Sequence, residues 1–229
     1  MSNGSNGNAA AWGLPGVLEF FSRHRTTSDD VYPSEWLFLK DRLREGMSVL
    51  DVGCAQGGFA SVLSEHLDDF SYTGLDINAE MIALARERHP VHTFHNIPEG
   101  RFELPEDAKF DLVLVLGILH LHESWRDTLT QAWAHTNGAL IFDLRESSAP
   151  TMEDKSQSYF KMDFGGGDAS HAQTILPYII VNSGDALAET DVCCPGAGRV
   201  QRYGYIHPVS ASAVTPIECV MACAYCIER

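Results

Sequence analysis

The chain has 229 residues, of which 45% are hydrophobic, enough for one well-buried α/β domain and too few for two full domains. Acidic residues outnumber Lys plus Arg by 31 to 16, and the net charge of −15 would repel a phosphate backbone, which disfavours nucleic acid as a partner. No stretch approaches the roughly 20 apolar residues of a membrane span, and the N-terminus lacks a secretory pattern. We therefore expect a cytoplasmic protein that binds neither nucleic acid nor membrane.

The first 46 residues indicate a tail followed by two helices. Residues 1–10 are mostly Ser, Asn, Gly and Ala, and we expect a disordered tail because few of these side chains could anchor it. Apolar residues at helical spacing predict a first helix over residues 14–24. A second helix is predicted to be capped by Ser34 and to end at Gly46. These helices would form an N-terminal cap over residues 11–46.

The stretch VLDVGCAQGGF, residues 49–59, joins a predicted strand to a predicted helix. Its first apolar residues indicate the end of a buried strand, and Gly53, Gly57 and Gly58 let the backbone turn tightly. From Phe59 onwards, apolar residues recur at helical spacing. The loop therefore lies where a doubly wound sheet binds ligands, beside free backbone N–H groups and the positive end of a helix dipole.

A carboxylate ends the next predicted strand, residues 72–77. Asp76 lies 23 residues after Gly53, where an acid can accept hydrogen bonds from both hydroxyls of a ribose. Asn78 is predicted to cap the helix that follows. A glycine loop with such an acid occurs both in dinucleotide-binding enzymes and in enzymes that use S-adenosylmethionine, so these features leave both cofactors open.

Two segments resemble class I S-adenosylmethionine-dependent methyltransferases of the small-molecule type. Residues 51–57, DVGCAQG, are similar to the first motif of that family, although Ala55 stands where glycine is usual, and residues 75–86, LDINAEMIALAR, are similar to its second strand and helix. The resemblance implies S-adenosyl-L-methionine as cofactor and S-adenosyl-L-homocysteine as product. The cofactor-binding residues that it implies are Asp51, Gly53, Cys54, Ala55, Gly57, Asp76, Ile77, Met81, Asn96, Ile97 and Leu116.

Two of these assignments carry alternatives. Met81 suits adenosine contact and simple core packing about equally well. Asn96 replaces the family's usual acid after the third strand, and its side-chain oxygen can still accept a hydrogen bond from the adenine amino group.

Strands and helices continue to alternate along the chain. Further strands are predicted at residues 91–95, 110–116 and 139–142, the second of them a continuous apolar run typical of a buried parallel strand. Residues 199–207 and 216–228 alternate like the antiparallel pair that closes this fold, and a short helix is expected over residues 183–189. The pattern predicts a doubly wound, mostly parallel, seven-stranded Rossmann-like sheet with N-terminal helices and an insertion after strand five.

A single domain over residues 11–229 follows from this alternation. Its expected parts are the helical cap, a cofactor-binding half over residues 47–144, and substrate-side segments with the closing strands over residues 145–229. Residues 147–170 are polar and contain three consecutive glycines, which favours a lid or insertion.

The resemblance implies in-line transfer of a methyl group to an O or N atom of a small molecule. A sulfonium methyl is already electrophilic, so the protein must mainly hold the acceptor in line and exclude water. If the acceptor carries a proton, His120 and His122, at the end of the fourth strand, are the candidate bases. The candidate substrate-side residues are Tyr32, Trp36, His171 and His207, although ordinary packing is favoured for the two aromatic residues.

The cysteines invite a different interpretation, a bound metal or cluster. Cys219, Cys223 and Cys226 have the spacing of a radical S-adenosylmethionine motif. In a strand, however, Cys226 would point to the face opposite Cys219 and Cys223, so we expect buried core cysteines. Asp143 and Glu146 are too few ligands for a metal site, and we predict none.

Three other functions compete with the small-molecule methyltransferase. An NAD-dependent oxidoreductase would place its glycine loop nearer the start of the domain, without an acid two residues before the first glycine. An RNA ribose methyltransferase would carry an acid just after strand four, where this chain has Leu116, Gly117 and Ile118, and the negative charge is wrong for RNA. A cofactor-binding protein without catalytic activity is the third.

Overall fold

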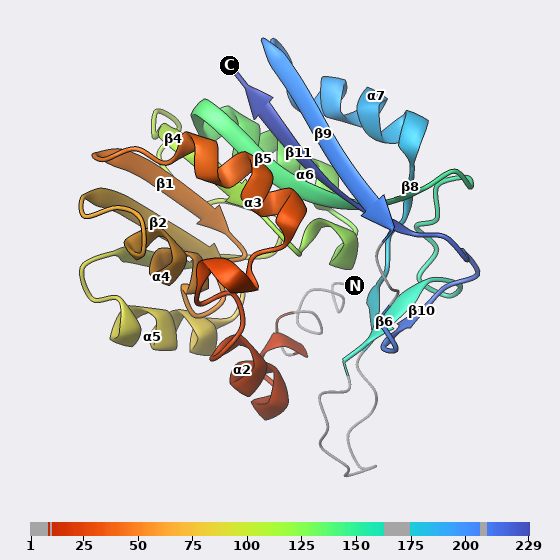
Figure 1. Ribbon diagram of the computed structural model, residues 1–229. Helices are drawn as coiled ribbons and strands as arrows, with labels where there is room; N and C mark the ends of the chain where they lie inside the picture. Colours follow the sequence, from red (N-terminus) through yellow and green to blue (C-terminus); the bar gives the residue numbers. More distant parts are fainter. Residues whose placement is uncertain (1–8, 10, 163–174, 207–209) are drawn as a thin grey trace.

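A computed structural model describes residues 9, 11–162, 175–206 and 210–229, so most of the expected tail lies outside the described residues (Figure 1). One large sheet runs through the molecule with helices on both faces (Figure 1). Its strands are β1 (Met47–Val52), β2 (Phe70–Asp76), β3 (Thr93–Asn96), β4 (Phe110–Val115), β5 (Thr136–Ser147), β8 (Val181–Asn182), β9 (Arg199–Ile206) and β11 (Met221–Glu228).

The strand order is β3-β2-β1-β4-β5-β11-β9, with the short β8 pairing with β5. Strands β1 to β5 are parallel to their neighbours, whereas β11 runs antiparallel to both β5 and β9. The doubly wound, mostly parallel sheet and its antiparallel closing pair are therefore confirmed.

The helices cover the two faces of this sheet. They are α2 (Pro15–Phe21), α3 (Pro33–Leu39), α4 (Gly58–Ser64), α5 (Ala79–Arg88), α6 (Trp125–His135) and α7 (Ser183–Cys193), with 3-10 turns η1 (Ser28–Asp30), η2 (Lys40–Arg42) and η3 (Leu119–Leu121). Residues of α3, α4 and α5 share one apolar cluster with the sheet, and residues of α6 and α7 share a second cluster on the opposite face. Burial on both faces explains why the central strands read as continuous apolar runs.

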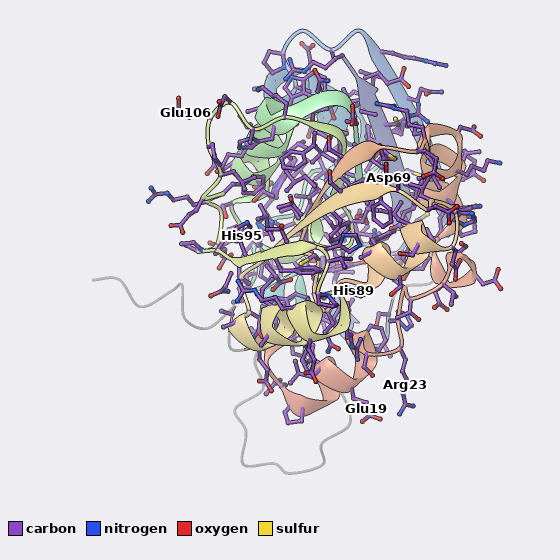
Figure 2. All side chains as sticks on the ribbon, turned by 90° about the vertical axis from the view of Figure 1, so that its left-hand side faces the viewer. Glu19, Arg23, Asp69, His89, His95 and Glu106 are labelled. Carbon is purple, nitrogen blue, oxygen red and sulfur yellow. The ribbon has the colours of Figure 1, made fainter. Side chains whose placement is uncertain are left out.

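Charged side chains gather on the outside of these layers. Glu19 and Arg23 lie at the outer end of α2 and point into solvent, where they form an exposed ion pair of 3.1 Å (Figure 2). His95, on the edge strand β3, also points outward (Figure 2). None of the helices in the described ranges is long and apolar enough to cross a membrane.

Several element boundaries differ from the sequence prediction. The second helix starts at Pro33, which takes the first helical position, so Ser34 lies inside the helix, and α3 ends at Leu39 instead of continuing to Gly46. Asn182, which accepts hydrogen bonds from the N–H groups of Gly184 and Asp185, caps α7. A turn in which the N–H of His92 bonds the carbonyl oxygen of His89 delays the third strand to Thr93.

The insertion after strand five takes part in a second, small sheet. Its strands β6 (Tyr159–Lys161) and β7 (Ile175–Pro177) pair with β10 (Ala213–Val214), which lies between β9 and β11, in the order β10-β6-β7. A third apolar cluster joins this small sheet to the N-terminal residues, since it includes Trp12, Phe21, Phe160, Met162 and Tyr178. The N-terminal segment and the insertion thus meet beside the carboxyl ends of the parallel strands.

Candidate active site

A cavity of about 480 Å³ opens at the carboxyl ends of β1, β2, β4 and β5. Its floor is the glycine loop between β1 and α4, and its walls come from the N-terminal segment, from η3 and from the small sheet. Asp51, Asp76 and Arg25 are charged residues beside the glycine loop, whereas the part lined by η3 and the small sheet is largely apolar. The apolar side chains of the whole lining include Trp12, Phe21, Leu121, Phe160 and Met162.

The glycine loop is packed too tightly to carry side chains at two of its glycines. Gly53 has a left-handed φ of +81°, and a Cβ there would lie 2.7 Å from Cγ2 of Ile118. A Cβ at Gly58 would lie 2.5 Å from the backbone oxygen of Arg25. Gly58 therefore lets the N-terminal segment lie directly on the first turn of α4.

Asp76 is held rigidly at the wall of the cavity. Its Oδ2 accepts a hydrogen bond from the N–H of Ala55 at 2.9 Å, and its Oδ1 accepts one from the N–H of Asn78 at 2.8 Å. Burial nevertheless raises the pKa of the carboxyl to about 6. A carboxylate oriented in this way has oxygen lone pairs left for the hydroxyls of a ribose.

Asp51 is a second buried carboxylate in the same cavity. Its side chain is almost fully enclosed, and it accepts a hydrogen bond from the hydroxyl of Tyr72. Burial raises its pKa to about 7. A cationic ligand group beside Asp51 would stabilise the ionised carboxylate, so this position suits an ammonium group.

Most of the other predicted cofactor residues also line the cavity: Gly53, Cys54, Ala55, Ile77, Met81, Ile97 and Leu116. Met81 also belongs to the third apolar cluster, so it both lines the cavity and packs in the core. Gly57 and Asn96 are not in the lining. The amide of Asn96 is exposed and donates a hydrogen bond to the carbonyl oxygen of Asp76 at 3.0 Å.

His120 and His122 follow β4 and both line the cavity. Each ring is buried, and each Nδ1 has no hydrogen-bond partner among the described residues. Burial lowers the pKa of His120 well below its usual value, with a further contribution from the nearby Arg145 cation, and burial lowers that of His122 to about 4. Both imidazoles are therefore neutral at neutral pH.

The predicted substrate-side residues separate into three groups. Tyr32 lines the cavity. Trp36 does not, because its ring packs against His66 with the ring centroids 5.0 Å apart. His171 and His207 lie outside the described residues.

Arg25 was not found from the sequence, although it joins the N-terminal segment to the site. Its guanidinium donates to the carbonyl oxygen of Leu116 at 3.2 Å and pairs with Glu35 at 2.7 Å. It also lies 5.2 Å from the centre of the Tyr32 ring and 5.6 Å from that of Phe59. Arg25 has a left-handed φ of 56°, a local strain that these contacts offset.

Arg145 and Tyr178 were missed as well. Strand β5 continues past its last pair with β4, which joins Val115 to Phe142, and places Asp143 and Arg145 on one face. Oδ2 of Asp143 accepts a hydrogen bond from Nη1 of Arg145 at 2.5 Å, and its Oδ1 accepts one from the N–H of Gly117 at 2.5 Å. The Arg145 cation also lies close enough to Tyr178 to lower the pKa of its hydroxyl against the larger effect of burial, and both residues line the cavity.

Known proteins resemble this chain in its central part. A family model described as a methyltransferase domain matches residues 50–139, which contain the glycine loop, Asp76 and both histidines. A fatty-acid O-methyltransferase of Mycolicibacterium smegmatis is 38% identical over 88 residues, which are 38% of this chain and 32% of that protein. The chain thus matches about a third of that relative's length.

Solved structures share the fold at low sequence identity. A putative S-adenosylmethionine-dependent methyltransferase from Listeria monocytogenes is 17% identical, with a TM-score of 0.56 over 86% of this chain and 98% of that one. A protein titled as a putative Zn-dependent alcohol dehydrogenase from Rhodobacter sphaeroides is 15% identical, with a TM-score of 0.60 over 98% of this chain and 99% of that one. Such likeness shows the fold alone, so the sequence matches decide between methyltransferase and oxidoreductase.

Residues 50–139 carry a methyltransferase domain, and the chain has the fold of class I S-adenosylmethionine-dependent methyltransferases. S-adenosylmethionine is the cofactor of this family, and the cavity suits it. Asp51, Asp76, Met81 and Ile97, which were predicted to bind this cofactor, all line the cavity, and their individual roles stay predictions.

The cysteines of the methyltransferase domain do not converge. Cys223 and Cys226 lie in the apolar clusters on opposite faces of the sheet, as the strand pattern predicts, and Cys219 is exposed. Within the described ranges, no group of three or more His, Cys, Asp or Glu side chains is arranged to hold a metal ion.

Proposed function

We propose that this protein transfers the methyl group of S-adenosylmethionine to an O or N atom of a small molecule. The observation that carries the proposal is one cavity with two ends. Its polar end joins the glycine loop to Asp51 and Asp76, and its apolar end lies beyond His120. When bound, the cofactor supplies an electrophilic methyl group, and the protein has to orient the acceptor behind it and exclude water.

Each part of the chain has a defined task in this proposal. Asp76 would bind the ribose, Asp51 the ammonium group, and Arg25, beside the glycine loop, the carboxylate of the methionine part. His120 and His122 would stand beside the acceptor and, as neutral imidazoles, could take a proton from a hydroxyl or an ammonium group. The aromatic side chains of the N-terminal segment and of the small sheet would enclose the acceptor.

Calorimetric titration with S-adenosylhomocysteine tests the cofactor half of the proposal. We expect micromolar binding to the wild-type protein, loss of binding in Asp76→Ala, and no binding of NAD in a parallel titration. Asp68→Ala, which removes an exposed acid at the other end of β2, is the matched control and should bind normally. Binding of NAD instead, or of neither compound, would refute the proposed function.

A further inference from the structure

The apolar end of the cavity contains one buried cation that no part of the cofactor requires. Arg145 lines the cavity together with His120 and Tyr178, and only 8% of its surface is exposed. A buried arginine is costly unless its hydrogen bonds are used, and Asp143 accepts one from Nη1 of Arg145 at 2.5 Å. The guanidinium therefore has a fixed orientation at the cavity wall.

The two arginines of the cavity come from different elements. The backbone of Arg25 lies against Gly58 in the glycine loop, and its guanidinium lies against Gly117, after β4. Arg145 comes from the extension of β5, and Tyr178, which also lines the cavity, packs edge-on against His120 at 5.7 Å between ring centres. The proposed function uses Arg25 for the carboxylate of the cofactor, which leaves Arg145 for a group on the acceptor.

The hydrogen-bond donors of Arg145 indicate the chemistry of that group. Arg145 pairs with Asp143, and Arg25 pairs with Glu35. Asp143 stays ionised, because the Arg145 cation outweighs burial and keeps its pKa below the usual value. Asp143 accepts its hydrogen bond from Nη1 of Arg145, so the other N–H groups of the guanidinium can donate to oxygen atoms of the acceptor.

Resting on the proposed function, we propose that the acceptor is an apolar carboxylic acid whose carboxylate is bound by Arg145 and Tyr178, and that the product is its methyl ester. Arginine and a tyrosine hydroxyl are suitable donors for a carboxylate. The apolar side chains that η3 and the small-sheet segment add to the lining, Leu121, Phe160 and Met162, would contact the remainder of the molecule.

The chemistry of this step needs no base. A lone pair of the carboxylate oxygen forms the bond to the methyl carbon, and the carbon–sulfur bond breaks with its electron pair remaining on sulfur. The positive and negative charges of the reactants cancel, and no proton is released. The two imidazoles beside the reaction centre are neutral and poorly basic, so they are weak proton acceptors but can still donate hydrogen bonds. This agrees with a reaction that needs no base.

A matched series that differs only in its head group tests the proposal. Octanoic acid, 1-octanol and octylamine are titrated calorimetrically into the protein saturated with S-adenosylhomocysteine, and the methylated products are measured with S-adenosylmethionine. We expect the acid to bind and to yield methyl octanoate, and the alcohol and the amine to do neither. 3-Phenylpropanoic acid extends the series to an aromatic chain.

Variants then assign the carboxylate to Arg145. Arg145→Met should weaken binding of the acid by about tenfold to a hundredfold, and Tyr178→Phe should weaken it by about tenfold. Both variants should bind S-adenosylhomocysteine with unchanged affinity. Arg145→Lys should restore part of the affinity, because it keeps the charge but not the planar set of donors. Arg202→Met is the matched control, since Arg202 also pairs with a buried carboxylate, Glu146, but lies outside the cavity lining.

The outcomes separate the two proposals. Preference for the alcohol or the amine, or no binding of either acid by a protein that binds S-adenosylhomocysteine, would overturn the carboxylate proposal and leave the proposed function standing. If Arg145→Met weakens S-adenosylhomocysteine and not the acid, Arg145 serves the cofactor and the assignment is wrong. Failure to bind S-adenosylhomocysteine at all would refute the proposed function itself.

Discussion

The backbone N–H of Ala55 donates a hydrogen bond of 2.9 Å to Oδ2 of Asp76, so the glycine loop and the acid of β2 are fixed to each other. Ala55 reaches this position with a left-handed φ of 46°, a conformation that glycine adopts without strain and alanine does not. Ala55 thus departs from the family pattern in its side chain, yet its backbone has the left-handed conformation that the usual glycine would adopt easily.

Replacing Ala55 tests this strain. Ala55→Gly should raise the free energy of unfolding by up to about 1 kcal/mol, because relief of the left-handed strain exceeds the added freedom of the unfolded chain. Ala55→Val should lower it by about 2 kcal/mol, because a β-branched side chain tolerates this conformation poorly. Urea unfolding followed by circular dichroism gives both values. Wild-type stability of Ala55→Val would show that the loop does not hold residue 55 in this conformation.

Gly58 offers a test of the contact between the N-terminal segment and α4. In an isolated helix, Gly→Ala would stabilise by about 1 kcal/mol. Here the new methyl group would meet the backbone oxygen of Arg25 at 2.5 Å, so we expect Gly58→Ala to destabilise the protein by about 1–3 kcal/mol and to weaken S-adenosylhomocysteine binding.

Gly196→Ala is the control for that variant. Gly196 has a left-handed φ of +74°, but a Cβ there would meet nothing within 4 Å. We expect a loss of about 1 kcal/mol from backbone strain alone and unchanged ligand affinity. Stabilisation by Gly58→Ala would mean that the N-terminal segment does not pack on the glycine loop.

The raised pKa of Asp51 predicts how cofactor affinity depends on pH. Its carboxyl has a pKa of about 7 and that of Asp76 about 6, and both must be ionised to bind an ammonium group and a ribose. Protonation therefore sets in as the pH falls below 7, and the affinity for S-adenosylhomocysteine should drop by about 25-fold between pH 6.5 and 5.5, where both acids titrate.

Two variants test which acid causes this pH dependence. Asp51→Asn should bind S-adenosylhomocysteine weakly at pH 7.5, and its affinity should depend on pH only near pH 6, where Asp76 titrates. Glu35→Gln removes a third buried acid whose pKa is raised, and it should keep the wild-type slope. Calorimetry at four pH values is sufficient, and an affinity that rises as the pH falls would contradict the role of Asp51.

The features that the sequence predicted well are local ones. The apolar strand before Gly53, the helical spacing after Phe59 and the acid at Asp76 all lie in one βαβ unit, where periodicity and turn chemistry agree with the final packing. The cap by Asn78 was likewise predictable, because its side chain bonds the N–H of Met81 within its own helix. These residues make up the cofactor end of the cavity.

The acceptor end depends on contacts between distant segments. The fifth strand was predicted over residues 139–142, ending at Asp143, yet β5 continues to Ser147, brings Arg145 to the cavity wall and pairs it with Asp143. The alternation of charged residues with Leu144 was the available signal. Arg25 and Tyr178 gave no local signal, because their roles arise from tertiary contacts with Leu116 and Arg145.

Replacing His120 distinguishes a base from a neighbour of the acceptor. If the acceptor is a carboxylate, His120→Asn and His122→Asn should each lower the turnover of octanoic acid by less than about tenfold, because no proton has to be removed. A hydroxyl or ammonium acceptor would instead lose about a hundredfold or more with its base. The pH profile of kcat supplies a second readout, and for the acid it should show no ionisation of histidine between pH 6 and 8.5, since burial keeps both imidazoles neutral there.

His95→Asn, on the exposed edge strand β3, is the matched control and should behave as wild type (Figure 2). A large loss in His120→Asn together with a kcat that rises through one ionisation in this range would identify His120 as a base and would contradict methylation of a carboxylate.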